Sequence, residues 1–345
     1  MRVLHVVEAL GGGVVSALRE YVSSTSGEVE HLLVSRDREA HDTGEQVGAT
    51  AVAELPSVAH PVEIGRRLRT AVRRTSPDLV HAHSSFAGLF ARIGPAADLP
   101  PVVYTPHCYA FERTDIARPV RRVLWTVEQR LAPRTAAVAG VSPREVELAH
   151  RLGVREALHV PQVVSLGEVV AAAPRPVGSP THYVTAGRIS AQKDPDFFRR
   201  AVVDVLAAEP DARITWLGGG GSADEEALAR VGVEITGWLP RGELVDRMAQ
   251  ADVYLHTAAW EGSPMTILEA QALGLPVVAR EIPALVSLGL AGLAATPPEM
   301  AAAALAARGR RGLPTSTSSV ESEGRARQRR ALLDVYVLAE GRASR

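Results

Sequence analysis

The stretch AWEGSPMTILEAQALGLPVVAR, residues 259–280, places a loop, a helix and a strand in direct succession. Ser263 is a favoured N-cap residue and Pro264 is favoured at the first helical position, so a helix is predicted to begin there. The apolar run at 276–280 contains adjacent valines and is typical of a buried strand. A helix that leads into such a strand is the repeating unit of a parallel α/β sheet.

Short β-branched runs alternate with helix-length amphipathic segments along the rest of the chain. In the first half, strands are predicted at 2–9, 31–36, 78–84, 101–107 and 136–142, with helices at 63–74 and 121–132. In the second half, strands are predicted at 181–188, 212–220, 233–238, 251–258 and 276–280. The alternation predicts an α/β protein of two Rossmann-like doubly wound domains, with a ligand cleft between them at the carboxyl ends of the strands.

Composition marks where the domains divide. Proline, glycine and alanine accumulate without periodicity at 161–180, which indicates an interdomain linker. The segment 308–327 is predicted to be flexible, and a last helix follows at 327–341. The predicted parts are an N-terminal acceptor-side domain at 1–165, a linker at 166–180, a C-terminal donor domain at 181–322, and a C-terminal helix at 323–345 that could return to the first domain.

Whole-chain properties exclude several classes of protein. The chain has 345 residues with 38 basic and 39 acidic side chains, a balance that argues against general nucleic-acid binding. The single cysteine, Cys108, excludes a disulfide framework, and it is predicted to be buried rather than nucleophilic. No apolar run reaches the ~20 residues of a membrane span, and the first ten residues do not form a signal peptide. We therefore expect a soluble cytoplasmic protein.

Two glutamates flank the start of the helix in the opening stretch. Glu261 and Gly262 lie in the loop before it, and Glu269 lies on the helix itself. The first backbone N–H groups of a helix have no internal partner and attract anions, which here assigns that role to Met265, Thr266 and Ile267. The carboxylates would accept hydrogen bonds from hydroxyl groups on either side of the anion. The alternative is a pair of unrelated surface glutamates.

Lys193 is the only lysine among the 38 basic residues. It follows Arg188 by five positions on a loop that leaves a predicted strand, so the two cations could close on one diphosphate. A compact ammonium suits a phosphate site differently from a planar guanidinium, although one surviving lysine could also be an accident of composition. Asp194 and Asp196 resemble a metal-binding pair, but Pro195 between them favours a helix N-terminus, and no catalytic metal is expected.

The first half of the chain contributes glycines and histidines at strand ends. Gly11, Gly12 and Gly13 follow the first strand, where a tight turn would bring backbone close to an anion. Ser16 stands where a dinucleotide fingerprint needs glycine, so a nicotinamide site is disfavoured and a plain turn is the alternative. His107 ends a strand and is predicted to enter the cleft, with His83 on the acceptor side; each could instead be a structural histidine.

These motifs together resemble the retaining glycosyltransferases of group 1, which have the GT-B fold and are also called glycosyltransferase family four. The resemblance rests on the glutamate segment, on GRISAQKD at 187–194, on GGG at 11–13, on VHAHS at 80–84, on YTPH at 104–107 and on VSPRE at 141–145. It implies that Arg188 and Lys193 grip the donor diphosphate, that Glu261 contacts the transferred sugar and that Glu269 contacts the ribose. It also places His107 against the sugar or the acceptor. The chain departs from the family at its hinge, where PQVVS replaces Asn-Gly-Val-Asp, and in a short region after Val278.

The resemblance implies a specific reaction. A hexose or N-acetylhexosamine would move from a nucleotide diphosphate sugar, with UDP as the favoured carrier, to an acceptor hydroxyl with retention of configuration. Backbone near Gly237 and Trp238 would bind the base, and no cofactor is expected. The favoured acceptor is a lipid-linked saccharide in cell-envelope or exopolysaccharide assembly. The alternatives are a soluble secondary metabolite as acceptor, a pyridoxal-phosphate phosphorylase with Lys193 as its Schiff base, and a non-catalytic nucleotide-sugar-binding protein.

A basic segment at 113–134 follows His107. Its apolar side chains recur at helical spacing, and its cations are Arg113, Arg118, Arg121, Arg122, Arg130 and Arg134. One reading is a crossover helix whose apolar stripe packs on the sheet. The other is a surface that docks on anionic lipid at the inner leaflet of the plasma membrane, each cation near the surface contributing ~1 kcal/mol.

Overall fold

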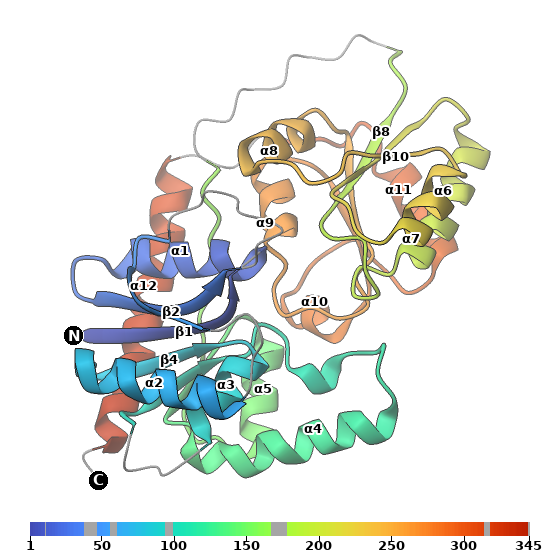
Figure 1. The fold of residues 1–345 in the computed structure, drawn as a ribbon. Helices are drawn as coiled ribbons and strands as arrows, with labels where there is room; N and C mark the ends of the chain where they lie inside the picture. Colours follow the sequence, from blue (N-terminus) through green and yellow to red (C-terminus); the bar gives the residue numbers. More distant parts are fainter. Residues whose placement is uncertain are drawn as a thin grey trace. The chain divides into compact units, whose positions relative to one another are not determined.

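The computed structural model describes residues 1–10, 12–37, 47–55, 61–93, 99–166, 178–313 and 318–343. It divides into two compact units, one made of Met1–Val163 with Ser322–Arg345 and the other of Val164–Glu321 (Figure 1). Each unit is a parallel sheet with helices on both faces, which confirms the predicted pair of doubly wound α/β domains. Most of the predicted linker, 167–177, lies outside the described residues.

The first unit contains a seven-stranded sheet in the order β3-β2-β1-β4-β5-β6-β7. Its strands are β1 Arg2–Leu10, β2 Glu30–Asp37, β3 Thr50–Glu54, β4 Leu79–His83, β5 Val102–Thr105, β6 Ala137–Gly140 and β7 Ala157–His159. Its helices are α1 Gly13–Thr25, α2 Pro61–Thr75, α3 Ser85–Arg92, α4 Arg118–Leu131, α5 Pro143–Leu152 and α12 Ser318–Ala343, with short 3₁₀ turns η2 Ala110–Glu112 and η3 Ala132–Arg134.

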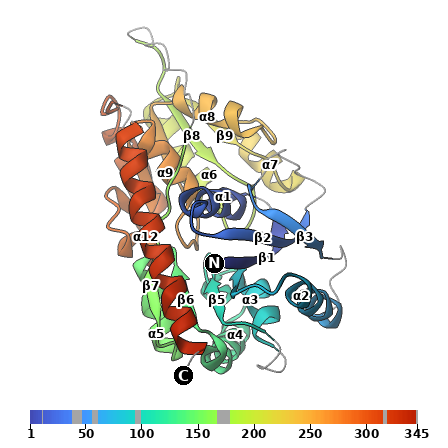
Figure 2. The same ribbon diagram turned by 90° about the vertical axis from the view of Figure 1, so that its left-hand side faces the viewer.

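Alternate side chains of the first sheet face two different layers. Leu4, Val80 and Tyr104 pack with α2, α3 and α5 on one face. Val3 and Leu79 pack on the other face. The C-terminal helix α12 contributes Leu332, Val335, Tyr336 and Ala339 to the same core. Figure 2 shows α12 running along this sheet beside β6 and β7. The last helix of the chain is therefore part of the first unit.

The second unit contains a six-stranded sheet in the order β10-β9-β8-β11-β12-β13. Its strands are β8 His182–Ala186, β9 Arg213–Leu217, β10 Val233–Ile235, β11 Val253–His256, β12 Val277–Arg280 and β13 Leu293–Ala294. Its helices are α6 Pro195–Ala208, α7 Ser222–Ala229, α8 Arg241–Ala249, α9 Met265–Ala272, α10 Pro283–Ser287 and α11 Pro297–Ala306. Phe198 and Met300 fill the core under α6 and α11, whereas Met248 and Ile267 fill the core under α8 and α9.

The structure corrects the sequence analysis in several places. Strands β3, β7 and β13 were not predicted, because short strands at the sheet edges carry little β-branched signal. The segment 308–327 is not flexible throughout, since α12 begins at Ser318 and runs without interruption through it. Residues 314–317 of that segment lie outside the described residues. Among the helices described here, none is long and apolar enough to cross a membrane.

Candidate active site

Close backbone contact fixes the loop that follows β8. Gly187 donates its N–H to the carbonyl of Leu217 at 3.0 Å, and Ile189 donates to the carbonyl of Gly219 at 3.0 Å. Gly218 has φ +142°, and a Cβ there would lie 2.2 Å from the carbonyl oxygen of Gly187. Only glycine permits this approach. The loop that carries the predicted diphosphate-binding cations is therefore held rigidly against the end of β9.

Lys193 and Glu261 form an ion pair between two strand ends. Lys193 Nζ lies 2.6 Å from Glu261 Oε1, and the side chains are 16% and 13% exposed. The backbone around the pair is tied as well, because Thr257 donates its hydroxyl to the Lys193 carbonyl at 2.6 Å and Ala259 N–H donates to the Gln192 carbonyl at 2.8 Å. β8 and β11 are neighbours in the sheet, so these two predicted site residues meet at its carboxyl edge.

His256 lies beneath this pair and was not identified from the sequence. It is the last residue of β11, is buried, and places Nε2 4.0 Å from Glu261 Oε1. Burial, followed by the Lys193 charge, lowers the pKa of His256 well below its usual value. Among the described residues its Nε2 has no hydrogen-bond partner. A histidine at the end of a predicted strand was the only available sequence signal.

Asp194 and Asp196 serve the start of α6. Asp194 is the N-cap, with φ 48°, and its Oδ1 accepts a hydrogen bond from the Phe197 N–H at 3.0 Å. Its other oxygen lies 2.6 Å from Arg280 Nη1. Asp196 pairs with Arg199 at 2.7 Å within the first turn. The prediction of a helix N-terminus with Pro195 in its first turn is confirmed, and both carboxylates are already engaged.

Helix α9 begins one residue later than predicted. Pro264, not Ser263, is the N-cap, because its ψ of 119° is still extended and the helix starts at Met265. The Ile267 N–H, which was predicted to bind an anion, instead donates to the Pro264 carbonyl at 3.1 Å. Thr266 accepts a hydrogen bond from the Tyr254 hydroxyl at 2.7 Å. Of the three N–H groups that were predicted to bind an anion, only those of Met265 and Thr266 therefore keep this predicted role.

Glu269 sits deeper than its partner glutamate. Its side chain is 3% exposed and lies 2.8 Å from Arg241 Nη1 at the start of α8. Burial, and after it the charges of Glu269 and Glu261, raise the pKa of the Tyr254 hydroxyl. The sequence analysis did not predict the partnership with Arg241. A ligand hydroxyl that reaches Glu269 would share it with that guanidinium.

Arg188 is exposed at the end of β8, and its guanidinium carbon lies 5.8 Å from the centre of the Trp238 ring. Trp238 is 48% exposed and follows Gly237, which has φ 68°, at the end of β10. An exposed indole beside a guanidinium offers a flat stacking surface. This geometry is compatible with a planar base, the ligand that the sequence analysis assigned to Gly237 and Trp238.

In the first unit, the predicted residues lie at or just after the carboxyl ends of the neighbouring strands β1, β4 and β5. Gly12 has φ 57° and precedes Gly13 at the start of α1; Gly11 lies outside the described residues. His83 is the last residue of β4 and is buried. His107 follows β5 with φ 48°, and its Nε2 lies 3.2 Å from His83 Nδ1. The two histidines therefore form one hydrogen-bonded unit.

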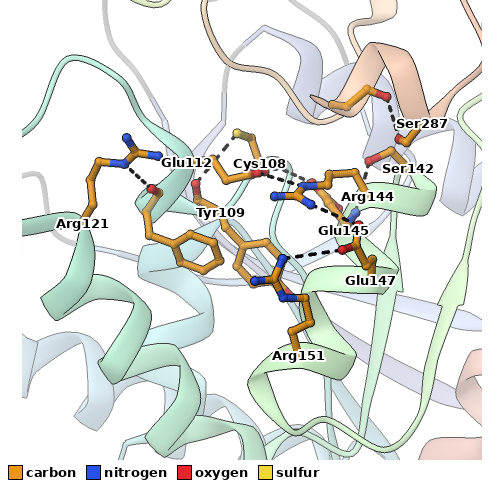
Figure 3. Close-up of polar contacts among 12 residues, drawn as sticks. Cys108, Tyr109, Glu112, Arg121, Ser142, Arg144, Glu145, Glu147, Arg151 and Ser287 are labelled. Atoms are coloured by element: carbon orange, nitrogen blue, oxygen red, sulfur yellow. Dashed lines mark hydrogen bonds and ion pairs between the residues drawn. The ribbon is translucent and has the colours of Figure 1, made fainter. Parts of the chain in front are cut away.

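Glu145 holds the turn that carries His107. Its carboxylate accepts a hydrogen bond from the Cys108 N–H at 2.6 Å (Figure 3) and another from the Val141 N–H at 2.9 Å. Cys108, with φ 81°, shares the left-handed conformation of His107 and is half-buried rather than buried as predicted. Burial raises the pKa of Glu145 to about 7. The Ser-Pro-x-Glu spacing at Ser142 is a capping-box signal that could have identified this residue.

Three buried histidines on the α1 and α12 side of the first sheet lie close enough together to resemble a metal site. The ligand atoms of His5, His81 and His83 lie within 4.8 Å of one another. Each of their six ring nitrogens is, however, already within hydrogen-bond distance of a histidine, threonine or tyrosine. A metal ion would have to break that network to bind.

Two sequence families match the chain along most of its length. Residues 11–163 match the glycosyl transferase 4-like domain, and residues 180–311 match the glycosyl transferases group 1. The chain belongs to the group 1 glycosyltransferases. This confirms the family resemblance and shows that the protein is a glycosyltransferase that uses a nucleotide-sugar donor.

Individual proteins agree with this assignment. The chain of this glycosyltransferase is 25% identical to UDP-Gal:alpha-D-GlcNAc-diphosphoundecaprenol alpha-1,3-galactosyltransferase of Escherichia coli, over 61% of this chain and 59% of that protein. It is 28% identical to D-inositol 3-phosphate glycosyltransferase of Segniliparus rotundus, over 59% and 51%. Anabaena HepE, solved in complex with UDP and glucose, has a TM-score of 0.69 at 16% identity and covers 100% of this chain and 98% of its own. The likeness to HepE confirms the GT-B fold.

Proposed function

We propose that this glycosyltransferase transfers a hexose or N-acetylhexosamine from a UDP-sugar to an acceptor hydroxyl, with retention of anomeric configuration. The observation that carries the proposal is the Lys193–Glu261 pair at 2.6 Å, on the loops after β8 and β11. A nucleotide diphosphate sugar has an anionic diphosphate directly beside a ring of hydroxyls. A cation and a carboxylate in contact match that sequence of groups, the cation facing the phosphate and the carboxylate facing the sugar.

The same pair explains how the bond would break. The diphosphate leaving group gains charge in the transition state, and a fixed cation aimed at that charge lowers the barrier. Glu261 holds Lys193 in place before the donor arrives, so little reorganisation is needed when the donor binds. The ion pair also argues against a pyridoxal-phosphate phosphorylase, because a Schiff base needs an uncharged amine that is free to attack an aldehyde.

One relative and one solved structure support UDP as the carrier, whereas two relatives differ in their acceptors. The Escherichia coli relative is named for a UDP-galactose donor and a diphosphoundecaprenol-linked acceptor, and HepE was solved with UDP. The Segniliparus relative is named for an inositol phosphate acceptor, which is water-soluble. We favour a lipid-linked saccharide acceptor in cell-envelope or exopolysaccharide assembly, because the exposed surface of α4 fits an anionic membrane.

Helix α4 exposes apolar side chains among its arginines. Val120 is 48% and Val123 61% exposed, whereas Leu131 is buried, so the predicted apolar stripe is buried along only part of its length. Arg118, Arg122 and Arg130 are also exposed. Exposed valines flanked by cations fit the interface of an anionic membrane, where the apolar groups insert and the cations meet phosphates. We infer a peripheral association with the cytoplasmic leaflet.

A thermal-shift panel of UDP-, GDP-, ADP- and dTDP-sugars tests the donor. UDP-sugars should raise the Tm most, and Lys193→Ala should abolish the shift. Arg200→Ala is the matched control, since it removes an exposed cation from the neighbouring α6. Slow hydrolysis of the preferred donor without acceptor would exclude a purely binding role. A Tm that no nucleotide sugar raises would refute the proposal.

Flotation with anionic liposomes at low and high salt tests the acceptor side. Binding at low salt should fall when Arg118, Arg122 and Arg130 are changed to alanine together. The control changes Arg66, Arg73 and Arg74 on α2, which removes the same charge from another exposed surface of the unit. Equal loss in both variants would indicate nonspecific attraction. Absence of flotation at low salt would favour a soluble acceptor.

A further inference from the structure

Histidines form a continuous chain through the buried face of the first unit. His5 Nδ1 lies 3.0 Å from His83 Nε2, and His5 Nε2 lies 2.9 Å from His31 Nδ1. His83 Nδ1 in turn lies 3.2 Å from His107 Nε2. The three histidines on strands are buried, and His107 is half-buried. The chain therefore runs from β2 across β1 and β4 to a predicted site residue.

Thr25, the last residue of α1, stands at the inner end of this chain. Its Oγ1 lies 3.0 Å from His31 Nε2 and 2.7 Å from the carbonyl oxygen of Tyr21. A carbonyl oxygen can only accept, and a threonine hydroxyl has a single hydrogen, so that hydrogen is donated to Tyr21. Thr25 Oγ1 must then accept from His31, which places the ring hydrogen of His31 on Nε2.

The hydrogen-bond direction at Thr25 determines which nitrogen carries the hydrogen in each ring of the histidine chain. A neutral imidazole has one donor and one acceptor nitrogen. His31 Nδ1 is therefore the acceptor for His5 Nε2–H, and His5 Nδ1 is the acceptor for His83 Nε2–H. His83 Nδ1 then accepts from His107. Burial lowers the pKa of both His31 and His107 to about 4, so these rings are neutral at neutral pH.

The surroundings of the chain agree with this direction. His81 Nε2 lies 2.8 Å from Thr105 Oγ1, which donates to the Ala139 carbonyl at 2.9 Å, and His81 Nδ1 lies 3.0 Å from the Tyr336 hydroxyl. The same reasoning gives His81 an Nε2–H. The Tyr21 ring packs against His81 and His83. Within the described part of the chain, no charged side chain is hydrogen-bonded to any of these rings.

We propose that this chain fixes His107 as a single tautomer, with its Nε2–H bonded inward and its Nδ1 lone pair offered to a substrate hydroxyl. The positioning residues are Thr25, His31, His5 and His83. His107 would then accept a hydrogen bond from a sugar or acceptor hydroxyl and would be unable to donate one to a phosphate. The identity of that hydroxyl rests on the proposed function, whereas the tautomer itself does not.

Nitrogen NMR of the ¹⁵N-histidine-labelled full-length protein tests the tautomer without any substrate. Long-range proton–nitrogen correlations separate a ring nitrogen that carries hydrogen from one with a lone pair. The His107 signals are identified by their loss in His107→Gln. The expected result is hydrogen on Nε2 and a lone pair on Nδ1 of His107, unchanged through neutral pH. Hydrogen on Nδ1 of His107 in the wild type would overturn the proposal.

Thr25→Val tests the origin of the direction. Valine keeps the shape but cannot accept from His31, so the chain should reverse and hydrogen should appear on His107 Nδ1. Thr25→Ser should restore the wild-type spectrum. Thr75→Val is the matched control. Thr75 ends α2 and donates its hydroxyl to the Ala71 carbonyl at 2.8 Å, as Thr25 does to Tyr21 at the end of α1, but among the described residues Thr75 is not hydrogen-bonded to a histidine. The control should leave the His107 signals unchanged.

Activity separates this proposal from the proposed function. Thr25→Val should lower kcat about tenfold, the worth of one hydrogen bond, with nucleotide binding unchanged. A Thr25→Val protein that loses stability while His107 keeps its tautomer would show a structural role only and overturn the proposal. Stoichiometric zinc on the purified protein would also overturn it, since a metal would occupy the ring lone pairs. A correct tautomer without sugar transfer would refute the proposed function alone.

Discussion

Mild acid should unfold the first unit, because it holds five neutral histidines, of which His5, His31, His81 and His83 are buried and His107 is half-buried. Burial lowers the pKa of each below the ordinary value of 6.5, to about 4 for His31 and His107 and to about 3 for His81. A histidine with a lowered folded pKa contributes stability above pH 6.5 that is lost as the pH falls toward the folded value. Acidification therefore favours the unfolded chain, which binds the protons.

The slope of this loss follows from the number of protons. Near pH 5.5 about nine-tenths of unfolded imidazoles are protonated while the buried ones are not, so five histidines take up between four and five protons on unfolding. Glu145 opposes them, because its folded pKa of about 7 lies above its ordinary 4.5 and unfolding releases about one proton. A net uptake of three to four protons corresponds to about 5 kcal/mol per pH unit. Typical domain stabilities are about 5–15 kcal/mol, so a domain in the lower part of that range should unfold within one to two pH units below 6.5.

Urea unfolding between about pH 7.5 and pH 5.5 measures this slope. Hydrogen exchange in peptides that cover β1 and β4 reads the first unit separately. His81→Gln should reduce the slope near pH 5.5 by about 1 kcal/mol per pH unit, and Glu145→Gln should increase it by a similar amount, whatever each does to stability at neutral pH. A free energy of unfolding that stays constant or rises on acidification would refute the reasoning.

Three further predictions concern side chains at the site and in the core. Lys193→Ala should reduce turnover by about a hundredfold to a thousandfold with the fold intact, and Lys193→Arg should also be impaired; wild-type activity in the arginine variant would make the lone lysine accidental. Glu261→Gln should lose sugar transfer more than UDP affinity in calorimetry, whereas Glu269→Ala should lose UDP affinity first, and equal effects would contradict the assigned roles. Glu128→Gln should destabilise the protein by about 3 kcal/mol in urea unfolding, because Arg92, 1% exposed and 2.8 Å away, would lose its charged partner.

The sequence predicted the parts of the fold that leave a strong local signal. The buried central strands of both sheets are apolar runs, and the alternation with helices permits few arrangements. The end of the chain was misjudged for a physical reason. Residues 318–327 are polar and contain a glycine, Gly324, so they have little helical pattern of their own. They continue a helix whose later turns pack Leu332 and Tyr336 against the sheet, and that tertiary contact is invisible in the local pattern.

The site shows the same division between local and non-local information. Lys193 and Glu261 were singled out by composition and motif, but their contact depends on β8 lying beside β11, which no local pattern encodes. Arg241 was missed as the partner of Glu269 because it begins a different helix and resembles any other surface arginine. Motifs therefore identified the chemical groups, and sheet order decided which of them meet.

The histidine chain depends most completely on strand register. The pattern HAH at 81–83 places both rings on one face of β4, because alternate side chains of a strand point the same way. In the sheet, His5 is paired with His81 and Val7 with His83, while His31 is paired with Val3 on the opposite side of β1. A shift of one residue in either pairing would turn these rings toward the α2 and α3 face and disrupt the hydrogen bonds between the histidines. The link between His107 and Thr25 is thus a property of the assembled sheet, although each residue in it looks like an isolated polar position in an apolar strand or at a helix end.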